Sequence, residues 1–128
     1  MGLDMFLRGE EQEDFSKTSA ARDRGDIVKV STVYELGYWR KHPDLHGYIV
    51  ETFADGKDEC QRISLGKNEL LQILKATGED KLPHTEGFFF GASEPGDKER
   101  TVQIILKALK WMEESPDTYR DVYYQASW

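Results

Sequence analysis

The sequence predicts an α+β fold in which about three helices pack on one side of a small, mainly antiparallel sheet. Both ends of the chain alternate like strands, at residues 2–7 and 119–128. Between them, residues 68–75 and 98–114 repeat apolar side chains every three to four positions, which is typical of helices with one buried face. Because 128 residues with 38% hydrophobic content can build one core, we expect a single domain over residues 1–128.

The predicted strands have patterns that also indicate where their side chains lie. In the first strand, Leu3, Met5 and Leu7 share one face. Near the middle of the second half of the chain, three consecutive phenylalanines between glycines indicate a short strand covered on both faces. The five predicted strands are residues 2–7, 27–30, 61–65, 87–91 and 119–128.

A further helix is predicted in the middle of the chain. Thr32 and Glu35 have the spacing of a capping box, so the helix would begin at Thr32. Apolar residues then recur every three to four positions as far as Phe53. Inside a helix Pro43 would cost roughly 3 kcal/mol, whereas at a first helical position it is well tolerated. The chain therefore either kinks near Pro43 or begins a second helix there.

Residues 8–26 differ from the rest of the sequence. Ten of these residues are charged, and Phe15 is the only large apolar side chain among them. Because this segment has little apolar surface to bury in a core, we expect a mobile polar loop or a hairpin insertion. The composition leaves open whether this segment closes over a ligand as a lid.

Composition bounds the compartment and the partners. The formal net charge is −7, from 24 acidic and 17 basic side chains, which argues against direct nucleic-acid binding and against docking on anionic lipid. Cys60 is the only cysteine, so no internal disulfide can form, as is usual in the reducing cytosol. No segment approaches the roughly 18 consecutive apolar residues of a membrane span. We therefore expect a cytoplasmic protein without membrane contact.

Three stretches resemble a known group of proteins: Gly2-Leu-Asp-Met-Phe-Leu7, Gly37-Tyr-Trp-Arg-Lys41 followed by His46, and Tyr123-Tyr-Gln-Ala-Ser-Trp128. In this order they resemble small bacteriophage and prophage proteins that open Met-Gly-Leu-Asp-Met-Tyr-Leu, carry a Tyr-Trp-Arg-Lys…His helix and often finish on a Tyr-Gln-Ser-Ser-Trp-like strand. The chain departs from the pattern at Phe6, where tyrosine is usual, and at His42-Pro43. The resemblance implies a phage accessory protein acting in a bacterial host cytoplasm, and it supplies no reaction.

The same middle stretch holds the candidate binding residues. Arg40 and Lys41 offer anion pairing beside the flat rings of Tyr38 and Trp39. The less apolar face of the last strand would add hydrogen bonds. The predicted ligand-binding set is Tyr38, Trp39, Arg40, Lys41, His46, Tyr123 and Gln125. The alternative is that Trp39 belongs to the core and that both cations are simply solvated.

Metal and catalytic chemistry find less support. A helix would place His42 and His46 on one face, but their spacing lacks the glutamate of His-Glu-x-x-His, and no second spaced pair of ligands exists. There is no Gly-x-Ser-x-Gly motif and no glycine-rich phosphate loop. We therefore expect no metal, no cofactor and no catalytic residue.

The sequence thus favours non-enzymatic binding in the host, most directly of a small anionic, nucleotide-like ligand such as a defence signal that a phage gains by sequestering. One alternative is an acidic protein–protein inhibitor of a host nucleic-acid-binding or defence enzyme. Another is a small hydrolase or transferase that depends on His46 or Asp4. Whether the chain forms a homo-oligomer is left open.

Overall fold

The computed structural model describes residues 2–86, 91–115 and 118–128, and the predicted strand at 87–91 lies almost wholly outside them. The described chain has the α+β architecture that the sequence predicts, with four helices and one four-stranded antiparallel sheet in the order β2-β1-β4-β3. The elements are β1 (Asp4–Gln12), α1 (Phe15–Asp23), β2 (Ser31–Arg40), α2 (Pro43–Phe53), β3 (Ile63–Ser64), α3 (Lys67–Gly78), α4 (Gly96–Glu114) and β4 (Arg120–Ser127).

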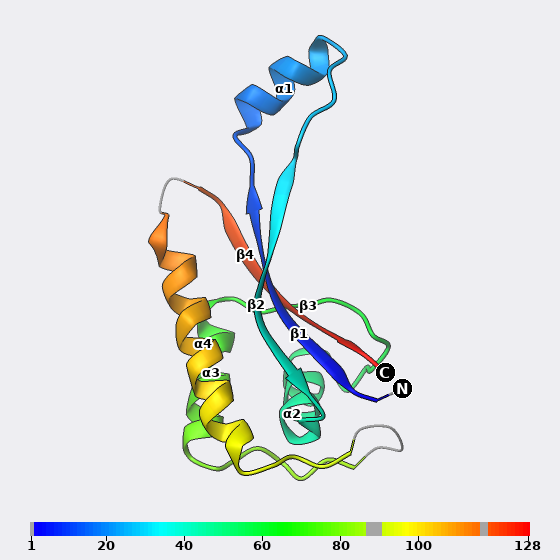
Figure 1. Cartoon of the computed structure of the whole chain (residues 1–128), viewed down its shortest axis with the longest axis vertical. Helices are drawn as coiled ribbons and strands as arrows, with labels where there is room; N and C mark the ends of the chain where they lie inside the picture. The colour runs from blue at the N-terminus through cyan, green and yellow to red at the C-terminus, as the bar shows by residue number, and fades with distance from the viewer. Residues whose placement is uncertain (1, 87–90, 116–117) are drawn as a thin grey trace.

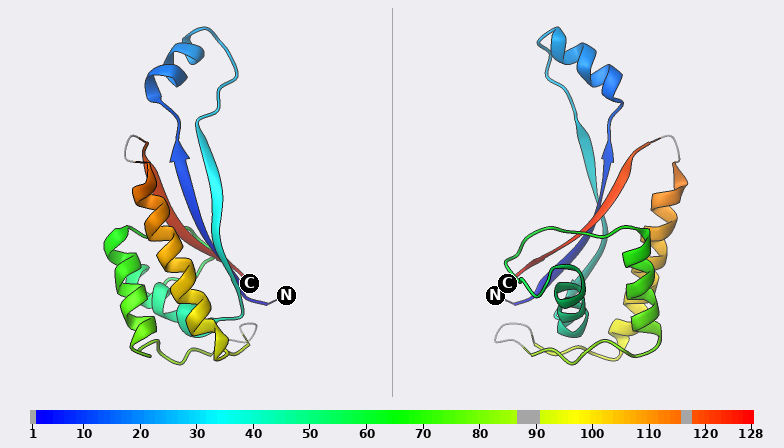
Figure 2. Two further views of the ribbon diagram at one scale, coloured as in Figure 1. Left: turned by 60° about the vertical axis from the view of Figure 1, so that its left-hand side comes forward. Right: turned by 180° about the vertical axis from the view of Figure 1, so that it is seen from behind.

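Three of these helices cover one face of the sheet (Figures 1 and 2). β1 is paired on both sides, so Met5 lies between Trp39 of β2 and Ala126 of β4. These three side chains are buried, and they face α2, α3 and α4. We call the opposite face of the sheet the helix-free face, because no described helix packs on it.

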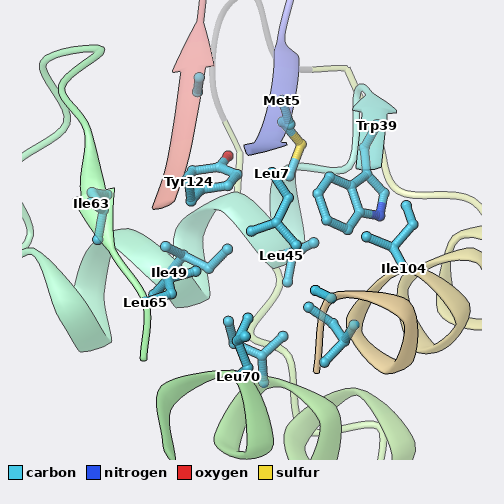
Figure 3. Packing of buried hydrophobic residues seen from close by; sticks show 14 of the residues in the cluster. Met5, Leu7, Trp39, Leu45, Ile49, Ile63, Leu65, Leu70, Ile104 and Tyr124 are labelled. Carbon is cyan, nitrogen blue, oxygen red and sulfur yellow. The ribbon is translucent and has the colours of Figure 1, made fainter. Parts of the chain in front are cut away.

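The core lies between the sheet and the helices (Figure 3). Leu45 and Ile49 of α2, Leu70 of α3 and Ile105 of α4 are each at most 1% exposed. Figure 3 places Leu45 between the strands and α3. Burying a side chain of this size contributes about 1.5–3 kcal/mol. None of the helices in the described ranges is long and apolar enough to cross a membrane.

The helix predicted from Thr32 is wrong, because residues 31–40 form strand β2. β2 is an edge strand, and pairing with β1 satisfies the backbone groups on its inner side. The helix begins instead at Pro43, which is the second of the two predicted alternatives and agrees with the preference of proline for a first helical position. Lys41, with φ at 57°, turns the chain between strand and helix. The strand predicted at 27–30 is likewise displaced, since β2 starts at Ser31.

The segment 8–26 holds regular structure. It contains the second half of β1 and all of α1, and with the start of β2 it extends away from the helices as an arm (Figure 1). Asp14 caps α1 by accepting a hydrogen bond from the Ser16 backbone N–H at 2.9 Å. Phe15 is 76% exposed, so this arm contributes little to the core.

Gly37→Ala tests the strand assignment of β2. A Cβ at Gly37 would lie 2.2 Å from Ile104 Cγ2 of α4, so we expect a loss of about 1–3 kcal/mol in the free energy of unfolding. If this segment were helical, the same change would stabilise it by about 1 kcal/mol. Urea denaturation measures the sign directly.

Gly78→Ala is the matched control, because no other heavy atom lies within 4 Å of a Cβ built there. It should leave stability equal or slightly higher. Combining Gly37→Ala with Ile104→Ala should cost less than the sum of the two single changes, since the contact is then relieved. Strict additivity would contradict the proposed clash.

Candidate functional site

The predicted cluster around Trp39 is divided by the pleat of β2. Trp39 faces the helices, is 1% exposed, and donates from Nε1 to Thr101 Oγ1 of α4 at 2.9 Å. Tyr38 and Arg40 stand on either side of it in the strand, so their side chains leave from the helix-free face. Lys41 is exposed just beyond the strand. The structure therefore places Trp39 in the core, apart from its neighbours on the surface.

His46 is also interior, where it joins three segments of the chain. Its Nδ1 lies 2.7 Å from the Tyr124 hydroxyl, and its Nε2 lies 2.9 Å from Asp58 Oδ2. Burial raises the pKa of Tyr124 well above its usual value, so its hydroxyl keeps the proton and pairs with Nδ1 as a neutral group. Asp58 in turn accepts a hydrogen bond from Trp128 Nε1 at 3.1 Å. This network ties α2 to β4 and to the loop before β3.

His42 and His46 do not converge on a shared ligand position. His42 is the N-cap residue of α2, and its Nδ1 lies 2.7 Å from Ser93 Oγ, whereas His46 contacts Tyr124 and Asp58. Within the described ranges, no three His, Cys, Asp or Glu residues are grouped so that they could hold a metal ion.

The remaining predicted residues share the helix-free face. Tyr38, Tyr123 and Gln125 lie on strands β2 and β4, with β1 between them. Phe6 of β1 is the Cα partner of both Tyr38 and Gln125, so the three form one row across the sheet. Gln125 also donates from Nε2 to the Cys60 carbonyl at 3.0 Å. The structure thus brings together residues that are distant in sequence.

Three functional candidates on this face were not in the predicted set: Phe6, Arg8 and Arg62. The Phe6 and Tyr38 rings are 5.3 Å apart, and the Arg8 guanidinium lies 4.4 Å from the Phe6 ring centre. Arg62 lies in the same way over Tyr123, at 4.6 Å. The strand alternation that continues past Leu7 is the signal that would have placed Phe6 and Arg8 on this face.

The helix-free face pairs aromatic rings with cations. Arg8, Arg40 and Arg62 lie on it or at its edge, while Asp4 is engaged by the Tyr38 hydroxyl, which donates to Oδ1 at 2.5 Å. The hydrogen bond to Asp4 raises the pKa of Tyr38, so the phenol remains a neutral donor. Guanidinium groups pair with carboxylate or phosphate oxygens, and aromatic rings stack on flat ligands.

Neither sequence nor fold links the chain to a characterised protein. No family model, no curated protein and no solved structure matches it. We therefore infer the function of the protein from the geometry of the described residues.

Trp39→Phe tests the buried hydrogen bond that holds β2 against α4. The change leaves the Thr101 hydroxyl, which is 0% exposed, without its partner, so we expect a loss of about 1–3 kcal/mol in the free energy of unfolding. Thr101→Val added to Trp39→Phe should recover part of the loss, because both polar groups are then gone. A double variant as unstable as the sum of the single ones would contradict this pairing.

Acidification should destabilise the wild-type protein more than His42→Gln. Burial lowers the pKa of His42, although Asp97 and Asp44 oppose this effect. Below the usual histidine pKa the unfolded chain therefore binds a proton that the folded chain does not, and the stability present above that pKa is lost as the pH falls. The difference in slope is at most about 1.4 kcal/mol per pH unit.

Urea unfolding of both proteins between about pH 7.5 and pH 5 measures this slope. His84→Gln is the matched control, because the side chain of His84 is 74% exposed. Equal slopes for the wild type and His42→Gln would contradict a neutral, buried His42.

Proposed function

We propose that this protein binds a small anionic, nucleotide-like molecule on its helix-free face and does not transform it. The observation that carries the proposal is the set of guanidinium–ring contacts across the sheet, at 4.4 Å for Arg8 on Phe6 and 4.6 Å for Arg62 on Tyr123. They occur in a chain whose formal net charge is −7, so these cations stand out from an acidic surface.

The chemistry of this face suits a base and a phosphate together. A nucleobase stacks on an aromatic ring or on an arginine plane, and each stacked base contributes about 1–3 kcal/mol. An arginine that lies flat on a ring keeps the N–H groups at its edge available for a phosphate. Tyr38 and Gln125 flank Phe6 in the same row, where the Tyr38 hydroxyl donates to Asp4 and Gln125 Nε2 donates to the Cys60 carbonyl.

The sequence indicates the biological context in which such binding would act. The resemblance of three stretches to phage and prophage proteins favours an accessory role in the bacterial cytoplasm, where sequestering a signalling nucleotide would protect the phage. Simple binding is favoured over catalysis because no described helix covers this face of the sheet, which offers little exclusion of water. Phe6 and Tyr38 are partly exposed there, whereas the Tyr123 ring beneath Arg62 is 6% exposed.

Calorimetric titration with AMP, a cyclic dinucleotide and adenosine tests this proposal. We expect the phosphorylated probes to bind and adenosine to bind more weakly. Arg8→Gln and Arg40→Gln should each weaken binding of the phosphorylated probes by about tenfold, the equivalent of one charge-assisted contact of about 1.4 kcal/mol. Raising the salt concentration should also weaken binding.

Lys107→Gln on α4 removes one positive charge from an exposed position on the helix side and should leave affinity unchanged. The proposal fails if no nucleotide binds to the folded protein. It also fails if Lys107→Gln weakens binding as much as Arg8→Gln does, because the effect would then be one of net charge.

A second candidate function, inhibition of a host protein, is favoured by the arm. Five of the large apolar side chains that the described chain exposes lie on the arm or at its base: Phe15, Ile27, Val30, Val33 and Tyr34. Exposed apolar side chains gathered on one projection are typical of a protein-binding surface.

Val30→Ser tests this second candidate in pull-downs from a bacterial lysate. Val30 is 54% exposed, so its replacement should abolish capture of a partner without unfolding the domain. Leu106→Ser, at a 46% exposed position on α4, is the matched control and should retain the partner. Equal loss in both variants would exclude the arm as the docking element.

A further inference from the structure

A cavity of about 530 Å³ lies between the start of α2, the end of α3 and the start of α4, on the helix side of the sheet. We call it the His42 cavity. Ligand sites in proteins usually have volumes of about 300–1,000 Å³, so it is large enough for a small molecule. Its polar lining includes His42, Asp44, Thr77, Asp80, Ser93 and Lys98.

Two buried polar atoms of this lining lack a partner. His42 Nε2 and Thr77 Oγ1 make no hydrogen bond to any described residue, although their side chains are only 3% and 2% exposed overall. These are the two buried side-chain atoms without a partner that the described ranges contain, and both residues line the same cavity. Buried polar groups are normally satisfied, so both atoms indicate a missing partner.

Ser93 holds the Nδ1 side of the His42 ring. Ser93 Oγ accepts from the Asp44 backbone N–H at 3.2 Å and lies 2.7 Å from His42 Nδ1. A serine hydroxyl has one proton and two acceptor lone pairs, so it can pair with Nδ1 in either tautomer of neutral His42. His42 Nε2, which has no described partner, can therefore donate or accept. Thr77 presents a hydroxyl, which can donate or accept.

The charged groups at the cavity define its selectivity. Asp44, Asp80 and Glu94 face a single cation, Lys98, which is paired with Asp80 at 3.0 Å. Such an excess of carboxylates repels anions and accepts hydrogen bonds from hydroxyl groups. The helix-free face differs in that its arginines stack on aromatic rings, at 4.4 Å for Arg8 on Phe6.

We infer that the His42 cavity binds an uncharged, polyhydroxylated molecule of the size of a sugar or a nucleoside. One oxygen of this ligand pairs with His42 Nε2 and another with Thr77 Oγ1, while its outer hydroxyls donate to the carboxylates at the rim. The His42 cavity and the helix-free face lie on opposite sides of the sheet. Each proposed site can therefore bind its ligand even if the other proposed site is shown not to bind one.

The test titrates the full chain with neutral monosaccharides and with the phosphorylated form of each. We expect a neutral monosaccharide to bind and its phosphorylated form to bind at least about tenfold more weakly. Thr77→Val should weaken binding by about threefold to tenfold, since one hydrogen bond is lost. His42→Gln, which replaces the imidazole, should weaken it as well.

Thr77→Val has a second readout in the free protein. Because Thr77 Oγ1 has no described partner, an isosteric apolar side chain should keep or raise Tm, by about 2–4 °C. Thr101→Val, at a buried threonine that is bonded to Trp39, should lower Tm instead. Arg8→Gln should leave binding of the neutral probe unchanged, which separates this site from the proposed nucleotide site.

Three outcomes would overturn the inference. One is that no neutral probe binds, or that only phosphorylated or cationic probes do. Another is that Thr77→Val binds the neutral probe as well as the wild type. The third is a lower Tm for Thr77→Val, which would mean that the hydroxyl already has a structural partner.

Discussion

The burial of Trp39 against α4 fixes which face of the sheet each side chain takes at the end of β2, from Gly37 to Arg40. Its indole is held from one side by pairing with Met5 and from the other by the hydrogen bond to Thr101. Because side chains alternate along a strand, a shift of one residue would expose the indole and bury Arg40. Such a shift would cost both the apolar burial and the hydrogen bond, so the register is strongly determined. Tyr38 and Arg40 reach the helix-free face as a consequence.

The sequence predicts the fold best where one periodicity extends over a whole element. The terminal strands and the helix before Ser115 are of this kind, and the structure has an element at each of these places. The prediction fails around Thr32, because the capping-box spacing is a local signal that pairing with β1 overrides. Apolar side chains recur every three to four residues between Thr32 and Phe53. The first part of this segment is nevertheless strand β2, and only the second part is helix α2.

The candidate site was predictable only in part, because strand pairing also determines which of its residues lie together. Tyr38, Arg40, Tyr123 and Gln125 have side chains whose chemistry predicts binding, and they share a face because β2 and β4 both pair with β1. The alternation of β1 places Phe6 opposite Met5 and Leu7, but only pairing with both neighbouring strands brings it next to Tyr38 and Gln125. The unsatisfied atoms of His42 and Thr77 depend on how three helices meet, so no spacing in the sequence could have indicated their cavity.

The stretch that carries the most chemistry in the sequence is therefore divided among three environments. Tyr38 and Arg40 lie on the helix-free face, Trp39 lies in the core, and His42 lines the cavity on the helix side. The division follows from the pleat of the strand and from the left-handed conformation of Lys41, where the chain leaves β2 and turns into α2. Neighbouring residues can therefore contribute to two separate regions of the surface, because the sheet lies between the aromatic rings of the helix-free face and the cavity that His42 lines.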